Sequence, residues 1–102
     1  MKTISVAESF SRYPAGRYID DGPYSGQRFR DEHLSVALNK LEPVIVELDG
    51  VRGYGSSFLE EAFGGLVRIG HSKEQVKELI HLKSDDPSLI EEIIFYIDHA
   101  ND

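Results

Sequence analysis

Two adjacent serines, Ser56 and Ser57, have the surroundings that most suggest chemistry in this chain. They follow a glycine-rich loop at residues 49–55 and come just before a stretch with helical periodicity. A strand, a glycine loop and a helix start form the layout of phosphate cradles, where free backbone N–H groups meet an anion. The loop lacks the third glycine of the dinucleotide fingerprint and the lysine of a P-loop, so nucleotide binding is disfavoured. No Gly-x-Ser-x-Gly surrounds either serine, so a serine hydrolase is disfavoured too.

Ser57 also has an interpretation that needs no chemistry. Ser57-Phe58-Leu59-Glu60 has the spacing of a capping box, in which the serine oxygen accepts from the third helical N–H and Glu60 reaches back. Serine is a preferred helix cap whatever the function of the protein. A phosphate on Ser57 would instead meet free N–H groups and the positive end of the helix dipole. Both interpretations stay open at the level of sequence.

The composition excludes several classes of protein. The chain has 102 residues, with 11 Lys+Arg against 18 Asp+Glu and a net charge of -7. This length predicts a single domain over residues 1–102. The acidic balance argues against general nucleic-acid binding, and no apolar run approaches the roughly 18 residues of a membrane span.

Cysteine and histidine usage bears on metals and on the compartment. Without cysteine there is no thiolate metal site, and the four histidines do not pair closely with carboxylates, so we expect no metal or cofactor. Residues 1–5 lack the long apolar stretch of a secretory signal. Together with the absence of cysteine, this favours a cytoplasmic protein.

The apolar pattern predicts strands that alternate with helices. Strands are expected at 3–10, 17–19, 44–48 and 80–83, and helices at 25–41, 57–67, 73–79 and from 87 onward. Segment 44–48 has apolar residues on both faces, which is typical of a central strand covered on each side. Ser25, Ser72 and Asp86 are expected caps. This order predicts an α/β sandwich with helices packed on a mixed or parallel sheet.

Gly64 and Gly65 fall inside the second predicted helix, where each costs about 1 kcal/mol relative to alanine. They either let a neighbouring segment approach closely or end the helix early, and the neighbour is either part of this chain or a partner; we expect internal packing.

Positive charge is concentrated in the first third of the chain, in Arg12, Arg17, Arg28 and Arg30. These arginines either receive an anion, with Arg17 and Arg30 as the candidates, or pair with nearby carboxylates.

One stretch is similar to the central motif of a known family. Residues 50–66, GVRGYGSSFLEEAFGGL, resemble that motif in the bacterial STAS-like domains of unknown function. The similarity extends over residues 11–68, because the family's N-terminal pattern is resembled by Ser11-Arg12, Gly16-Arg17, Asp21-Gly22, Ser25-Gly26 and Phe29-Arg30. It implies a STAS-like two-layer sandwich, with helices packed on a mixed sheet.

The resemblance also carries functional expectations. In STAS domains that antagonise anti-sigma factors, a partner kinase phosphorylates a serine at a helix start and so switches binding off. The motif there is Asp-Ser-Ser-Gly, and its second serine falls on Ser57, with Ser56 as the alternative phosphoacceptor. Gly55 replaces the aspartate and Phe58 replaces the glycine. The resemblance therefore implies a small non-catalytic domain in signalling by partner switching, whose partner is a kinase-like ATP-binding regulator.

The expected docking surface lies around residues 55–63. We assign to it Arg52, Tyr54, Gly55, Phe58 and Glu61, and we expect an exposed apolar patch near Phe58. The alternative is a small-molecule-binding or enzymatic domain, with a pocket between the loops 21–30 and 53–57. A third interpretation is an accessory module of a larger defence or mobile-element system, with no chemistry of its own.

Overall fold

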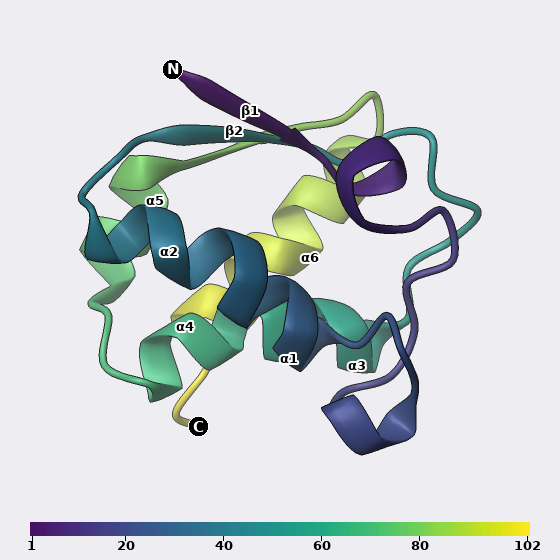
Figure 1. Cartoon of the computed structure of the whole chain (residues 1–102). Coiled ribbons are helices and arrows are strands. Elements are labelled where there is room, and N and C mark those ends of the chain that lie inside the picture. The colour runs from purple at the N-terminus through teal and green to yellow at the C-terminus, as the bar shows by residue number, and fades with distance from the viewer.

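The computed structural model describes residues 1–102, as three strands and a layer of helices. The strands β1 (Lys2–Ser5), β2 (Val44–Glu47) and β3 (Ile80–Lys83) form one sheet in the order β1-β2-β3, and both pairs are parallel. In Figure 1 the sheet runs across the top, and the labelled helices lie below it. The α/β class is confirmed, but the mixed sheet is wrong. Helical connections return the chain to the same edge before each strand, and this makes neighbouring strands parallel.

Strand β2 is central, as predicted, with Val44 in register with Lys2 of β1 and Ile80 of β3. Val44 and Val46 are fully buried against the helices, whereas Ile45 and Glu47 are only partly buried. The expectation that this strand is covered on both faces is therefore wrong. The helices pack on one face of the sheet, so the sheet has one buried and one open face.

Two long helices each contain a π-helical turn in the middle. The first combines α1 (Gly26–Phe29), η3 (Arg30–Leu34) and α2 (Ser35–Asn39). The second combines α3 (Ser56–Leu59), η4 (Glu60–Gly64) and α4 (Gly65–Arg68). Both match predicted helices, with ends that differ by one or two residues.

Two further helices, α5 (Lys73–Leu79) and α6 (Pro87–Asp98), complete the layer. The three predicted caps are confirmed, because Ser25 accepts from the N–H of Arg28, Ser72 from Gln75 and Asp86 from Ser88. None of the helices combines the length and the apolar character that crossing a membrane requires.

The first predicted strand is shorter than expected. It ends at Ser5, and the next residues form the π-helical turn η1 (Val6–Phe10) instead of continuing the strand to residue 10. Ser5 caps this turn by accepting from the N–H of Glu8. A side chain that bonds the local backbone in this way offers an alternative to the sheet ladder.

The strand predicted at 17–19 is absent. The short 3-10 helix η2 (Ile19–Asp21) takes its place. The Asp21 carboxylate accepts from the N–H groups of both Arg17 and Tyr18, so those groups are satisfied locally and need no neighbouring strand.

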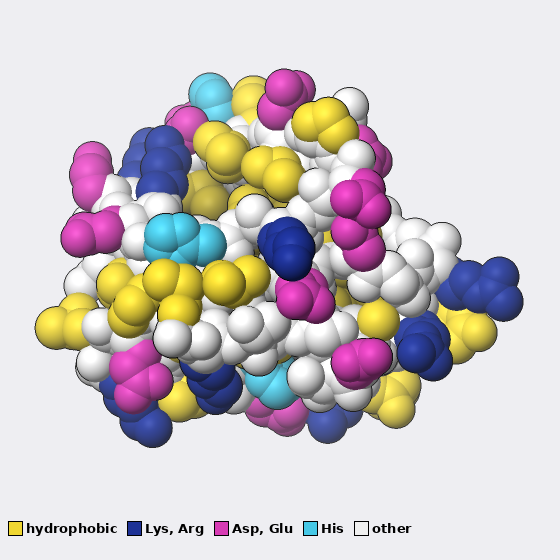
Figure 2. Space-filling model, turned by 90° about the horizontal axis from the view of Figure 1, so that it is seen from above, with side chains coloured by type: hydrophobic (Ala, Val, Ile, Leu, Met, Phe, Trp, Pro, Cys, Tyr) yellow, Lys and Arg dark blue, Asp and Glu magenta, His cyan; other side chains and the backbone are white.

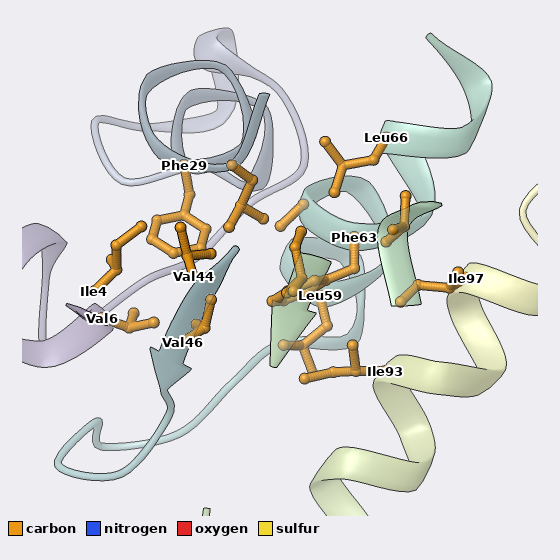
Figure 3. Packing of buried hydrophobic residues seen from close by; sticks show 14 of the residues in the cluster. Ile4, Val6, Phe29, Val44, Val46, Leu59, Phe63, Leu66, Ile93 and Ile97 are labelled. Atoms are coloured by element: carbon orange, nitrogen blue, oxygen red, sulfur yellow. The ribbon is translucent and has the colours of Figure 1, made fainter. Parts of the chain in front are cut away.

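The core lies between the sheet and the helices and consists of one cluster of 18 buried residues. In Figure 3 the strand residues Val44 and Val46 face Phe29 on one helix and Leu59 on the other. Ile93, on α6, lies on the far side of Leu59. The helix that begins with the two serines therefore packs against the core along its inner face.

Candidate functional site

Ser56 and Ser57 are exposed in the first turn of the helix 56–68. The N-cap is Gly55, which forms no side-chain cap, so the predicted capping box from Ser57 to Glu60 is wrong. The helix begins two residues earlier than the box requires, and neither serine hydroxyl caps it. The phosphoacceptor role assigned to Ser57, or to Ser56, stays a prediction.

The loop before the serines is anchored but open. The Tyr54 hydroxyl donates to the carbonyl of Leu48 at 2.7 Å, and burial raises the pKa of Tyr54. The backbone N–H of Arg52 donates to the carbonyl of Arg12 at 3.0 Å. Gly53, like Gly55, has no atom within 4 Å of the place where a Cβ would stand. Arg52 and Gly55, both predicted docking residues, are thus exposed, whereas Tyr54 is half-buried.

Two other predicted docking residues are buried. Phe58 is 0% exposed and Glu61 is 6% exposed, so the expected apolar patch at Phe58 is wrong. The Phe58 ring packs beside Phe29, with ring centroids 6.0 Å apart, because the helix turns this position toward the core. Phe58 therefore packs in the core beneath the docking surface and is not part of that surface.

Exposed apolar side chains occur instead on the N-terminal loop. Tyr18 is 53% exposed and Ile19 is 56% exposed, at the start of η2. Arg17 ties this turn to the serine-bearing helix by bonding Glu60 and Glu61. The strand that the sequence predicts at 17–19 would pair with a neighbour, so the prediction misses this exposed patch.

Three arginines and two glutamates join the loop, both long helices and the C-terminal segment. We call Arg17, Arg30, Arg68, Glu60 and Glu61 the ion cluster. Arg68 binds Glu60 through two bonds of 2.6 and 2.8 Å and also donates to the carbonyl of Ala100. Arg30 donates to Glu61, and both side chains are 8% exposed. These contacts fix the position of the helix 56–68 relative to the N-terminal loop.

The ion cluster shifts the pKa of Glu60. Burial alone would raise the pKa of Glu60, but hydrogen bonds from Arg68 and Arg17, with their positive charges, lower it below its ordinary value. The prediction that Arg30 is free to bind an anion is wrong, because it is buried and bonded to Glu61. Arg17 keeps partial exposure, although its guanidinium already holds both glutamates.

Glycines allow these segments to approach one another. A Cβ on Gly65 would lie 2.6 Å from Nη1 of Arg30, and one on Gly64 would lie 3.0 Å from the carbonyl oxygen of Tyr96. The expected internal packing of this glycine pair is confirmed. Gly26 is tighter still, since its Cβ would lie 2.4 Å from the carbonyl oxygen of Phe58. The two parts of the sequence that suggested a family thus pack directly on each other.

A hollow of about 390 Å³ lies at the carboxyl ends of β2 and β3. No residue of 21–30 lines it, so the pocket predicted between the loops 21–30 and 53–57 is absent there. Gly26, at the start of α1, packs on the helix 56–68, and Arg17, which lies before that segment, bonds the same helix through Glu60 and Glu61. The lining contains three carboxylates and no basic side chain: Leu48, Asp49, Gly50, Val51, Gly53, Tyr54, Ser84, Asp86, Ser88, Leu89 and Glu92.

Nowhere in the structure do three or more histidine, aspartate or glutamate side chains gather closely enough to hold a metal ion.

Comparison with known proteins places the sequence in a family. Nothing matches among the curated proteins, and nothing matches among the solved structures. One family model matches residues 25–89, well over half of the chain. The match begins after the N-terminal loop and continues past the expected end at residue 68. It contains the glycine loop, both serines and all of the ion cluster except Arg17. The chain belongs to the family described as STAS-like domain of unknown function (DUF4325).

Proposed function

We propose that this chain is a non-catalytic domain of the cytoplasm that docks a protein partner at the start of the helix 56–68, and that phosphorylation there switches docking off. The proposed partner is a kinase-like ATP-binding regulator. The proposal rests chiefly on one observation. Ser56 and Ser57 are exposed in the first turn of a helix and neither hydroxyl caps it, whereas the next residue, Phe58, is buried in the core. A modification at this point changes the surface without changing the packing beneath it.

The local electrostatics support a phosphate on Ser57. Phosphorylation adds about -1.5 to -2 charges, and free N–H groups at a helix start favour an anion. Glu60, one turn further along, is already bonded by Arg17 and Arg68, so its charge is balanced. It also forms no capping bond that a phosphate would have to break. A phosphate on Ser57 would therefore neither break a capping bond nor face an unpaired negative charge at Glu60.

Partner contact is expected on the surface around the serines. The exposed loop residues Arg52, Gly53 and Gly55 lie before them, and Tyr18 and Ile19 are tied to the same helix through Arg17. Aromatic and arginine side chains are enriched in protein interfaces, because they offer large contact areas with a polar end. We call this set, with Ser56 and Ser57, the serine surface.

The test is affinity purification from the source cell with four baits: the wild type, Ser57→Ala, Ser57→Asp and Ser72→Asp. Ser72 is the matched control, because it too is an exposed serine at a helix start. We expect an ATP-binding protein with the wild type, Ser57→Ala and Ser72→Asp baits, and its loss with Ser57→Asp. Intact-mass spectrometry should find one phosphate on part of the wild-type bait and none on Ser57→Ala.

Two results would contradict the proposal. If all four baits recover the same partner, the serine surface does not control docking. If the phosphate persists on Ser57→Ala, the assignment to Ser57 is wrong, and its loss from a fifth bait, Ser56→Ala, would identify Ser56 as the acceptor.

A second candidate function, binding of a small molecule or an enzymatic activity, is favoured by the hollow at the carboxyl ends of β2 and β3. Ligands of open parallel sheets commonly bind at this end of the strands. Asp49, Asp86 and Glu92 would repel a nucleotide phosphate, so a neutral or cationic ligand fits the hollow better. Thermal-shift screening of such compounds against the wild type and Ser88→Leu tests this candidate. It fails if no compound stabilises the wild type more than the variant.

A further inference from the structure

Strand β3 lies at the edge of the sheet and pairs only with β2. Its outer backbone N–H and C=O groups therefore have no strand partner. An exposed edge of this kind is a template for an additional strand, because main-chain hydrogen bonds form with any extended segment. The side chains beside the edge then decide which segments bind.

A groove of about 320 Å³ lies beside this strand. We call it the edge groove, and five of its seven lining residues are hydrophobic: Lys77, Ile80, His81, Leu82, Ile90, Ile94 and Ile97. Ile94, on α6, is 38% exposed, although it lies on the same helix as the fully buried Ile93. The upper part of Figure 2 shows hydrophobic side chains around a hollow on this side of the molecule. Helix α6 thus presents more apolar surface than three strands cover.

The alternation along β3 sets what a neighbouring strand would meet. Ile80 is buried and Leu82 partly buried on the helix side, whereas His81 and Lys83 are exposed on the open face of the sheet. A strand laid beside β3 alternates in the same way. Its inward side chains would enter the apolar groove, and its outward side chains would lie next to His81 and Lys83.

The outward positions select for negative charge. Neither His81 nor Lys83 takes part in an ion pair. On the inner side, Lys83 is in register with Glu47 of β2, so a carboxylate already flanks it there. Cross-strand pairs of opposite charge stabilise a sheet by about 0.2–1 kcal/mol each. An acidic residue on the outer side would complete a carboxylate–lysine–carboxylate row.

A second copy of this chain does not fit the edge. Residues directly opposite each other in an antiparallel pair share a face of the sheet. The antiparallel registers that pair β3 most fully with β3 of the copy, and that keep Ile80 and Leu82 on the helix side, place His81 or Lys83 opposite His81 or Lys83 of the copy. None of these pairings gives Lys83 a carboxylate on its outer side, which acidic residues of another segment would supply.

We infer that the edge groove binds an extended segment of a partner protein in which apolar and acidic residues alternate. The segment adds a fourth strand beside β3, its apolar side chains fill the groove over α6, and its acidic side chains lie beside His81 and Lys83. This surface shares no residue with the serine surface, so it stands whether or not phosphorylation controls docking there.

The test is a nuclear magnetic resonance titration of the full chain with a capped heptapeptide in which valine alternates with glutamate. We expect shifts and slower amide exchange confined to residues 80–83, together with methyl shifts of Ile90 and Ile94. Replacing glutamate by lysine in the peptide should weaken binding about fivefold or more. Two further peptides carry N-methyl groups on alternate amides, one at the odd and one at the even positions. Only one of these two sets of amides faces β3, so one peptide should lose binding and the other should keep it.

Variants of the chain sharpen the test. Lys83→Glu should reverse the preference toward the lysine peptide, whereas Lys40→Glu, the same charge change at another exposed lysine, should not. Ile94→Ser should weaken binding, and Val36→Ser should not, since Val36 is 39% exposed on α2. Ser57→Asp should leave binding unchanged, which separates this inference from the proposed function.

Four outcomes would overturn the inference. The first is no binding up to about 1 mM peptide, and the second is equal binding of the two N-methylated peptides. The third is chemical-shift changes outside β3 and α6, and the fourth is equal affinity for the glutamate and lysine peptides. A concentration-dependent dimer in sedimentation, disrupted by Ile94→Ser, would assign the edge to a second copy instead.

Discussion

At the scale of single residues, the ion cluster is the feature that joins the site to the rest of the molecule. The side chain of Glu61 is buried and accepts from Arg17, Arg30 and Arg68, so its negative charge is matched on more than one side. Removing one member of a buried pair leaves an uncompensated charge, which is far more costly than the pair is stabilising. The cluster thus makes the position of the serine-bearing helix depend on charged residues from three parts of the chain.

Glu60→Gln should lower the stability of the protein in a way that depends on pH. The folded-state pKa of Glu60 is lowered, so its charged form stabilises the fold above its ordinary pKa of 4.5. That contribution is lost as the pH falls through the folded value. We expect the difference in unfolding free energy between wild type and variant to be largest near about pH 7 and to shrink toward about pH 3. Urea unfolding followed by circular dichroism measures it, and a difference independent of pH would contradict the assignment.

Gly26→Ala should destabilise the fold by about 1–3 kcal/mol, the usual cost of overpacking. Its Cβ would lie 2.4 Å from the carbonyl oxygen of Phe58 and 3.1 Å from the backbone nitrogen of Ala62, and neither backbone atom is free to move aside. Gly53→Ala is the control, because nothing lies within 4 Å of that Cβ. Thermal unfolding compares the two, and equal melting temperatures would show that the two helices do not meet closely at Gly26.

At the scale of elements, the two long helices face each other through their π-helical turns. Arg30 belongs to the turn η3, and its partner Glu61 belongs to η4. π-helical turns are uncommon and occur mostly as single turns inside α-helices. Gly64 is the last residue of η4 and lets the end of α6 come close, and Gly65, the first residue of α4, does the same for Arg30. The helix that presents the serines is therefore positioned by contacts along its middle, beyond its exposed first turn.

Ser25→Ala and Ser57→Ala should differ sharply in stability. Ser25 is buried and accepts from the N–H of Arg28, so its loss should cost about 1 kcal/mol. Ser57 forms no cap and is exposed, so its loss should stay within about 0.5 kcal/mol. Chemical denaturation of both variants checks this. An equal loss for Ser57→Ala would restore the capping interpretation and weaken the proposed role in docking.

At the scale of the whole molecule, a three-stranded sheet covered on one face has little core in reserve. Phe58→Ala should cost about 3–5 kcal/mol, as for other buried aromatic residues. The total stability expected of a domain this size is about 5–15 kcal/mol. We therefore expect a large fall in melting temperature, measured by calorimetry, and a loss of partner binding only through unfolding. A variant that keeps its stability and loses the partner would instead show that Phe58 is part of the docking surface.

The open face and the free edge of the sheet are properties of the whole molecule as well. With helices on one side only, outward residues such as Ile45 and His81 do not join the core. Sheets of three strands are smaller than the usual four to six. The combination of a short sheet and an apolar helix that reaches past its edge is what makes the edge groove a candidate for strand addition.

The sequence by itself determined the helices, the central strand, three helix caps and the family, because these depend on local periodicity and on residue types at fixed spacings. It could not determine the parallel sheet or its open face, since these depend on which segments meet. Long-range contacts also decided the site. Gly55 became the cap instead of Ser57, Phe58 turned inward, and Glu60 was bonded by Arg17 and Arg68, which lie 43 and 8 residues away. The contacts of these residues depend on how distant segments pack together, and this packing cannot be predicted from the spacing of residues along the chain.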